Sequence, residues 1–152
     1  MANNTPWQVV EAIRDQLARI TLDNDYGTDI GSKIYLYDLQ RPGNKLPSIA
    51  IGARTGVIDR TGETRGNRAL NSKARTMSIT IEAAMNGAPA DYQKLALDML
   101  EDIERAWIVK TELAPAALGL ITLDSWQILD SPAGIEGVVL QIAGTAEYIR
   151  NP

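Results

Sequence analysis

Carboxylate, lysine, arginine and tyrosine side chains carry the chemistry open to this chain, because its 152 residues include no histidine and no cysteine. That composition excludes Ser-His-Asp triads, cysteine nucleophiles and histidine bases. It also excludes metal sites that need nitrogen or sulfur ligands, such as zinc centres. No cofactor is expected, and what remains is oxygen-ligand metals, paired carboxylates and binding through charged surfaces.

Three aspartates, Asp23, Asp25 and Asp29, have a spacing that resembles a calcium-binding loop. An EF-hand loop beginning at Asp23 requires glycine at its sixth position and glutamate at its twelfth. Those positions hold Thr28 and Ile34. The spacing therefore predicts an ordinary polar loop without a metal.

Four further carboxylates lie close together on a predicted helix: Asp98, Glu101, Asp102 and Glu104. Catalytic carboxylates need surroundings that drive their pKa values apart. A solvated helix face does not provide such surroundings. We expect these four residues to form that solvated face, and we expect no enzymatic activity.

The three tryptophans, Trp7, Trp107 and Trp126, could stack against nucleic-acid bases. Basic residues do not alternate with them, however, and each lies on the apolar side of a predicted element. We therefore predict that all three pack in the core.

The segment from Val57 to Arg75, VIDRTGETRGNRALNSKAR, has no apolar periodicity and lies between two predicted strands. It contains two acids and five cations, which are Arg60, Arg65, Arg68, Lys73 and Arg75. The whole chain is acidic, with a formal charge of −4. Long loops in compact domains are usually functional or disordered.

Three interpretations of this basic loop stay open. It could be a plain hairpin tip, a mobile arm that binds an acidic surface of a neighbouring protein, or a phosphate contact. The five cations are our candidate interface residues. Possible acidic counterparts on a neighbour are Asn24, Asp25, Asp29, Glu101 and Asp102.

The pattern of the chain predicts an α+β fold in the order α-β-β-β-α-β-β, with a mainly antiparallel sheet and two helices packed on one face. The predicted helices cover residues 6–21 and 88–107. The predicted strands cover residues 32–38, 46–54, 76–85, 119–129 and 138–149. We expect one domain over 1–152, with a long mobile loop at about 55–75.

No membrane span or signal peptide is expected. No apolar run approaches the ~20 residues that cross a bilayer. The first ten residues, MANNTPWQVV, lack the basic and apolar regions of a secretory signal.

This order of elements resembles the tail terminator proteins of long-tailed bacteriophages. The resemblance extends over nearly the whole chain and is carried by its proportions and by the segments SKIYLYD, RTMSITIEA and DYQKLALDMLEDIERAW. It implies a structural protein that forms a ring, typically a hexamer. Such a ring caps the tail tube, stops its polymerisation and offers a docking surface to the head connector.

The resemblance also implies the partners and the location. These are copies of the chain itself, the tail tube protein and head–tail connector proteins, with DNA only passing through the ring. The protein would be found in the tail or neck region of the virion, and in the host cytoplasm during assembly. Another head–tail joining, neck or tail completion protein is a close alternative, and a nucleic-acid contact module using the basic loop is a more distant one.

Overall fold

The computed structural model describes residues 6–36, 45–58, 73–108, 121–130 and 137–150. These residues contain two α-helices, α1 (Pro6–Leu17) and α2 (Tyr92–Ile108). Five strands complete the fold: β1 (Ile34–Tyr35), β2 (Ser48–Ile58), β3 (Lys73–Met85), β4 (Ile121–Asp130) and β5 (Val138–Arg150). Their order along the chain confirms the α+β prediction.

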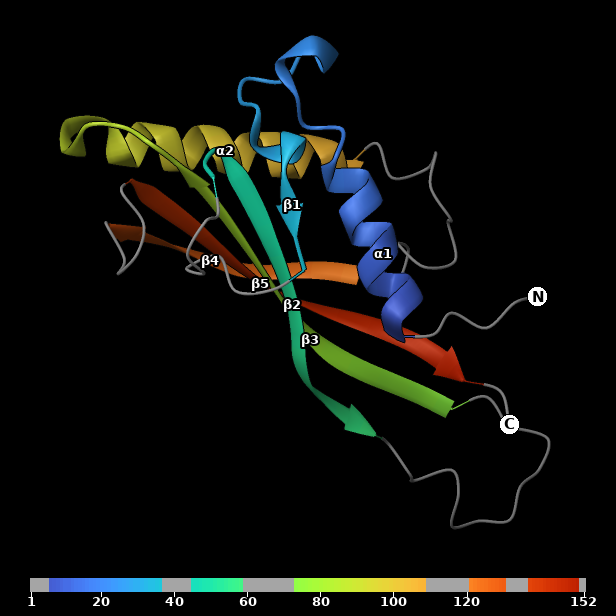
Figure 1. Cartoon of the computed structure of the whole chain (residues 1–152). Coiled ribbons are helices and arrows are strands. Elements are labelled where there is room, and N and C mark those ends of the chain that lie inside the picture. The colour runs from blue at the N-terminus through green and yellow to red at the C-terminus, as the bar shows by residue number, and fades with distance from the viewer. Residues whose placement is uncertain (1–5, 37–44, 59–72, 109–120, 131–136, 151–152) are drawn as a thin grey trace, which may run out of the picture.

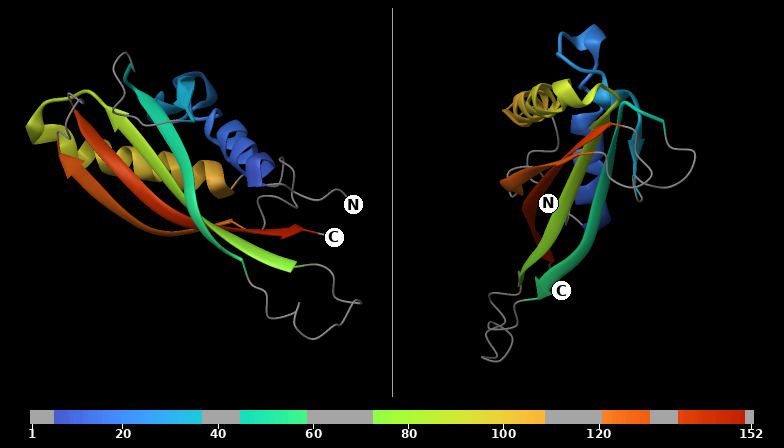
Figure 2. Two further views of the ribbon diagram at one scale, coloured as in Figure 1. Left: turned by 60° about the horizontal axis from the view of Figure 1, so that its bottom comes forward. Right: turned by 90° about the vertical axis from the view of Figure 1, so that its left-hand side faces the viewer.

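The strands form one mixed sheet in the order β1-β2-β3-β5-β4. The β2–β3, β3–β5 and β5–β4 pairs are antiparallel, and the short β1 pairs with β2 in parallel. Figures 1 and 2 show α1 and α2 on the same face of this sheet. The predicted two-layer arrangement is therefore confirmed.

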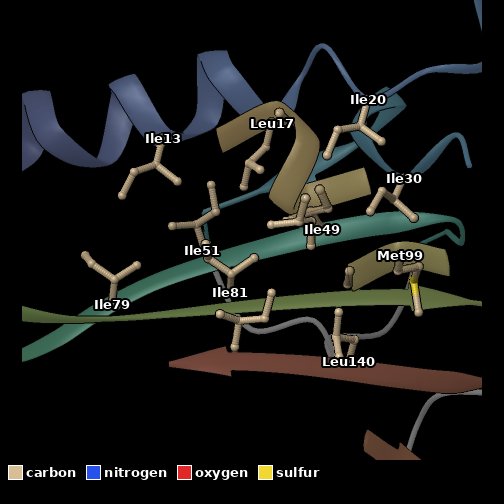
Figure 3. Close-up of a cluster of buried hydrophobic side chains, with 14 of the residues drawn as sticks. Ile13, Leu17, Ile20, Ile30, Ile49, Ile51, Ile79, Ile81, Met99 and Leu140 are labelled. Atoms are coloured by element: carbon tan, nitrogen blue, oxygen red, sulfur yellow. The ribbon is translucent and has the colours of Figure 1, made fainter. Parts of the chain in front are cut away.

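A single large cluster of aliphatic side chains fills the space between the two layers (Figure 3). The predicted alternation of β3 is confirmed, because Ile79, Ile81 and Ala83 are fully buried. On α2 the predicted apolar stripe is also buried, with Met99 and Ile103 at its centre. Burying such side chains contributes roughly 1.5–3 kcal/mol each.

Helix α1 ends at Leu17, earlier than the predicted Thr21. The last turn tightens, because the Ile20 amide donates to the Leu17 carbonyl three residues back. Gly31 then packs directly on this turn and donates its amide to the Ile20 carbonyl at 2.8 Å. A side chain at position 31 would collide with the Leu17 and Ile20 backbone, so glycine is required there.

The first strand is shorter than predicted. Residues 30–32 form a 3₁₀ turn and only Ile34 and Tyr35 pair with β2. The Gly31 amide bonds to the end of α1, and Ile30 beside it is buried in the core, so this turn takes the place of the first residues of the predicted strand. Residues 37 and 38 of the predicted strand lie outside the described part of the chain.

Strands β2 and β3 are longer than predicted and take up both ends of the expected basic loop. Val57 pairs with Thr76, and Ile58 pairs with Arg75. On its other side β3 continues along β5, with Lys73 opposite Arg150. The backbone ladder to β5 thus extends the strands although the sequence there has no apolar alternation.

Asp102 was predicted to lie on a solvated helix face, and this prediction is wrong. The side chain is only 3% exposed. One carboxyl oxygen accepts a hydrogen bond from the Thr28 hydroxyl at 2.6 Å, and the other accepts one from the Gly27 amide at 3.1 Å. Asp102 therefore attaches the polar segment that follows α1, at Gly27 and Thr28, to the middle of α2. Because its carboxylate is already buried and hydrogen-bonded, Asp102 is no longer a candidate partner for the predicted basic loop.

Arg105 reinforces the same attachment one turn further along α2. Its guanidinium donates to the Asp25 carbonyl at 3.2 Å and lies 4.5 Å from the centre of the Tyr26 ring. A cation over an aromatic ring contributes about 0.5–1 kcal/mol at exposed sites. The aspartate-rich connection is thus held in place by Asp102 and Arg105 of α2.

Replacing Asp102 with alanine is expected to lower the free energy of unfolding by about 1–3 kcal/mol, because it leaves the buried Thr28 hydroxyl and the Gly27 amide without their acceptor. Glu101→Ala, at the exposed neighbouring position, is the matched control and should change it by less than about 0.5 kcal/mol. Urea unfolding measures both values. Equal effects of the two substitutions would show that the Asp102 contacts do not stabilise the fold.

Candidate interaction surface

The five cations of the predicted interface fall into two groups. Arg60, Arg65 and Arg68 lie outside the described residues. Lys73 and Arg75 lie within β3, where their backbones pair with β5, so these two positions belong to a strand rather than to a loop. Figure 2 shows that the ends of β2, β3 and β5 run side by side beyond the helical layer.

In the part of the chain that the structure describes, the outer side of β2 is an open sheet edge along most of its length. Among the described residues, β1 pairs with it only at Ile49 and Ala50. From 51 to 58 the described strand partner of β2 is β3, on its inner side, with a register shift between Ala53 and Thr55. An unpaired strand edge presents a row of amide donors and carbonyl acceptors that another strand can use.

A cleft of about 830 Å³ lies along this open edge. Its walls come from the start of α1, from Leu36, and from β2 and β3. Its lining includes Trp7 and Val10 of α1 and Ile51 and Gly52 of β2. The space beside Gly52 is open, because a Cβ atom added there would meet no other atom within 4 Å. We call the open edge of β2 together with these four residues the β2-side surface.

Two of the three tryptophans are exposed, which overturns the prediction that all pack in the core. Trp7 is 56% exposed at the start of α1, and Trp126 is 49% exposed on β4. Trp107 alone packs against the core cluster, where it is partly buried. Half-exposed tryptophans are typical of surfaces that bind other proteins.

Trp126 lies beside a second, smaller hollow, of about 200 Å³, at the opposite edge of the sheet. Leu100 and Glu104 of α2 form one wall, and Leu123 and Trp126 of β4 form the other. Leu97 is 40% exposed, one turn before Leu100 on the same helix. We call Leu97, Leu100, Glu104, Leu123 and Trp126 the β4-side surface.

A bulge in β4 sets the direction of the Trp126 side chain. The register with β5 shifts between Leu123 and Ser125, so Asp124 is the extra residue. The Asp124 carboxylate is held by the hydroxyls of Thr122 at 3.0 Å and Thr145 at 2.8 Å. Trp126 then stands opposite Ile142, on the face that carries the helices. Two consecutive polar residues inside an apolar strand were the sequence signal for this bulge.

The charged groups of the described residues were also considered as metal ligands and as ion pairs. No group of three or more aspartates or glutamates there could hold a metal ion. On α2, Asp98 accepts a hydrogen bond from Lys94 at 2.8 Å, and this bond, with the charge of Asp98, raises the pKa of Lys94. Neither described helix has the length and apolar character needed to cross a membrane.

Comparison with models of known protein families and with curated proteins found no match to this chain.

The two glycines of β2 provide a test of the open cleft. Gly52→Val should leave the free energy of unfolding within about 1 kcal/mol of the wild type, because the added side chain enters open space and valine favours strands. Gly56→Val should lower it by more than about 2 kcal/mol, because its Cβ would collide with the Thr76 carbonyl and lie 3.1 Å from the Met77 Cα.

Denaturant unfolding of both variants, side by side, makes this measurement. Similar losses at the two positions would contradict the open wall at Gly52.

Proposed function

We propose that this protein is a structural component of a phage tail, a tail terminator that assembles into a ring on the end of the tail tube. The ring stops further polymerisation of the tube and offers a docking surface for the head connector. The protein acts by binding to copies of itself and to other virion proteins, and it performs no chemistry.

One observation carries the proposal: in the described part of the chain the sheet has two open edges, and each has an exposed tryptophan beside it. Natural proteins usually protect such edges, because they invite pairing with other chains. Here the β2 edge is long and borders an apolar cleft, while Trp7 and Trp126 leave large apolar areas in water. A protein that works through its edges accounts for both features.

The asymmetry of the edges supports a ring in particular. A subunit that presents one surface and receives a different one joins its copies head to tail, and such contacts close into rings when the rotation between copies allows it. The β2-side and β4-side surfaces differ in size, in composition and in the element that contributes the tryptophan. The order of the elements, which resembles the tail terminators, agrees with this role.

Electron microscopy of purified tail tubes mixed with the protein tests the proposal directly. We expect protein density at one end of each tube, and tubes incubated with fresh tube subunits should stop growing when the protein is present. Analytical ultracentrifugation of the protein alone reports its mass in the same buffer.

Three other outcomes are informative. Binding to isolated head connectors, with bare tube ends, would identify a neck or head–tail joining protein instead. Binding to DNA that weakens steeply with salt would favour a nucleic-acid contact role. A protein that binds neither tube ends nor connectors would contradict the proposed function.

A further inference from the structure

We propose that copies of this chain join by continuing the sheet, with the β4 edge of one copy pairing antiparallel with the β2 edge of the next. The inference rests on the self-assembly in the proposed function and assigns the two surfaces that meet. The occupant of the β4-side surface is thus the β2-side surface of a second copy.

The directions of the strands determine whether β2 and β4 of neighbouring copies pair in parallel or antiparallel. Each of the pairs β2–β3, β3–β5 and β5–β4 is antiparallel. Three reversals across the sheet leave β2 and β4 running in opposite directions. A second copy related by rotation about an axis along the strands therefore brings its β2 antiparallel to the first copy's β4, which is the more stable way to pair two strands.

The lengths of the two edges suit each other. The open part of β2 covers residues 51–58, and β4 covers Ile121–Asp130. Of the described strands, β4 and β1 are the outermost, and β1 shields only the first residues of β2. Both edges thus have backbone donors and acceptors along a run of similar length.

The side chains beside the edges also meet in this arrangement. Trp126 stands on the helix-bearing face of β4, next to Leu100 of α2. Trp7 lies at the start of α1, on the same face and at the other edge. Continuing the sheet keeps the helices on one side, so the two tryptophans approach each other across the junction and exclude water from its hydrogen bonds.

Charge favours this pairing over pairing of like edges. Glu104 and Asp124 line the hollow of the β4-side surface. Two β4 edges would place the carboxylates of one copy beside those of the other, which disfavours the pairing of like edges.

The experiment uses one variant for each edge. Trp7→Glu/Gly52→Glu disables the β2-side surface, and Leu97→Glu/Trp126→Glu disables the β4-side surface. The chain should tolerate them, because Gly52 has open space around it and the other three side chains are 40–56% exposed. A glutamate at position 7 is also favoured by the positive end of the α1 dipole.

Sedimentation of each variant alone, and of their 1:1 mixture, reports the assembly. Each variant alone should be a monomer of 16.6 kDa. The mixture should form a dimer and nothing larger, because it contains one intact junction and two disabled surfaces that repel. Wild type and the control Leu22→Glu, which changes a 60% exposed leucine away from both edges, should form the ring.

Several results would overturn the proposal. If the Leu97→Glu/Trp126→Glu variant alone formed dimers, two β2 edges would be pairing with each other. If the Trp7→Glu/Gly52→Glu variant alone formed dimers, two β4 edges would be pairing with each other. The proposal would also be refuted if either variant alone formed rings. It would be refuted if the mixture stayed monomeric while the wild type formed rings, or if the wild type did not assemble either in solution or on tube ends. Circular dichroism and thermal unfolding verify that each variant is folded.

The proposed function is tested separately by the tube assay. Rings that bind no tube end would remove the terminator role and leave the edge-to-edge junction intact. If the disabled variants still assembled into rings that cap tubes, the terminator role would be supported and the edge-to-edge junction would be refuted.

Discussion

The unpaired backbone groups along the outer sides of β2 and β4 are the constraint from which this account follows. A buried amide or carbonyl without a partner costs about 1–3 kcal/mol, so an open edge must stay in water or find another strand. Within the described residues, α1 and α2 cover one face of the sheet and leave both edges uncovered. In the described part of the chain, the outer backbone groups of these two strands are therefore left to pair with water or with another strand.

The core joins all of the long strands to the helices, and it includes Ile49 and Ile51 of β2 and Ile121 of β4. Its centre is formed by β3 and β5 between their two neighbours, with Ile81, Met99 and Leu140 fully buried beneath the helices. Asp102 and Arg105 of α2 hold the polar segment that follows α1 through hydrogen bonds to Thr28 and Asp25. The side-chain contacts of the core join the helices to the sheet without using the outer backbone groups of the described parts of β2 and β4.

Much of this architecture could be predicted from the sequence, because period-two alternation in β3 and the apolar stripe of α2 report directly on burial. Side chains whose position depends on distant residues could not. Asp102 looks like a surface carboxylate until Thr28 and Gly27 are placed against it. Trp126 looks like a core residue until the bulge places it at an edge that α2 only partly covers. Which edges stay open is a property of the whole sheet.

Amide hydrogen exchange, compared between the dilute monomer and the assembled protein, tests the central claim most directly. The account predicts that outward-facing amides of β2 within 51–58 and of β4 become protected together on assembly, while amides of the exposed turn Leu22–Asn24 exchange at an unchanged rate. Assembly that leaves the exchange of either edge unchanged would contradict the account.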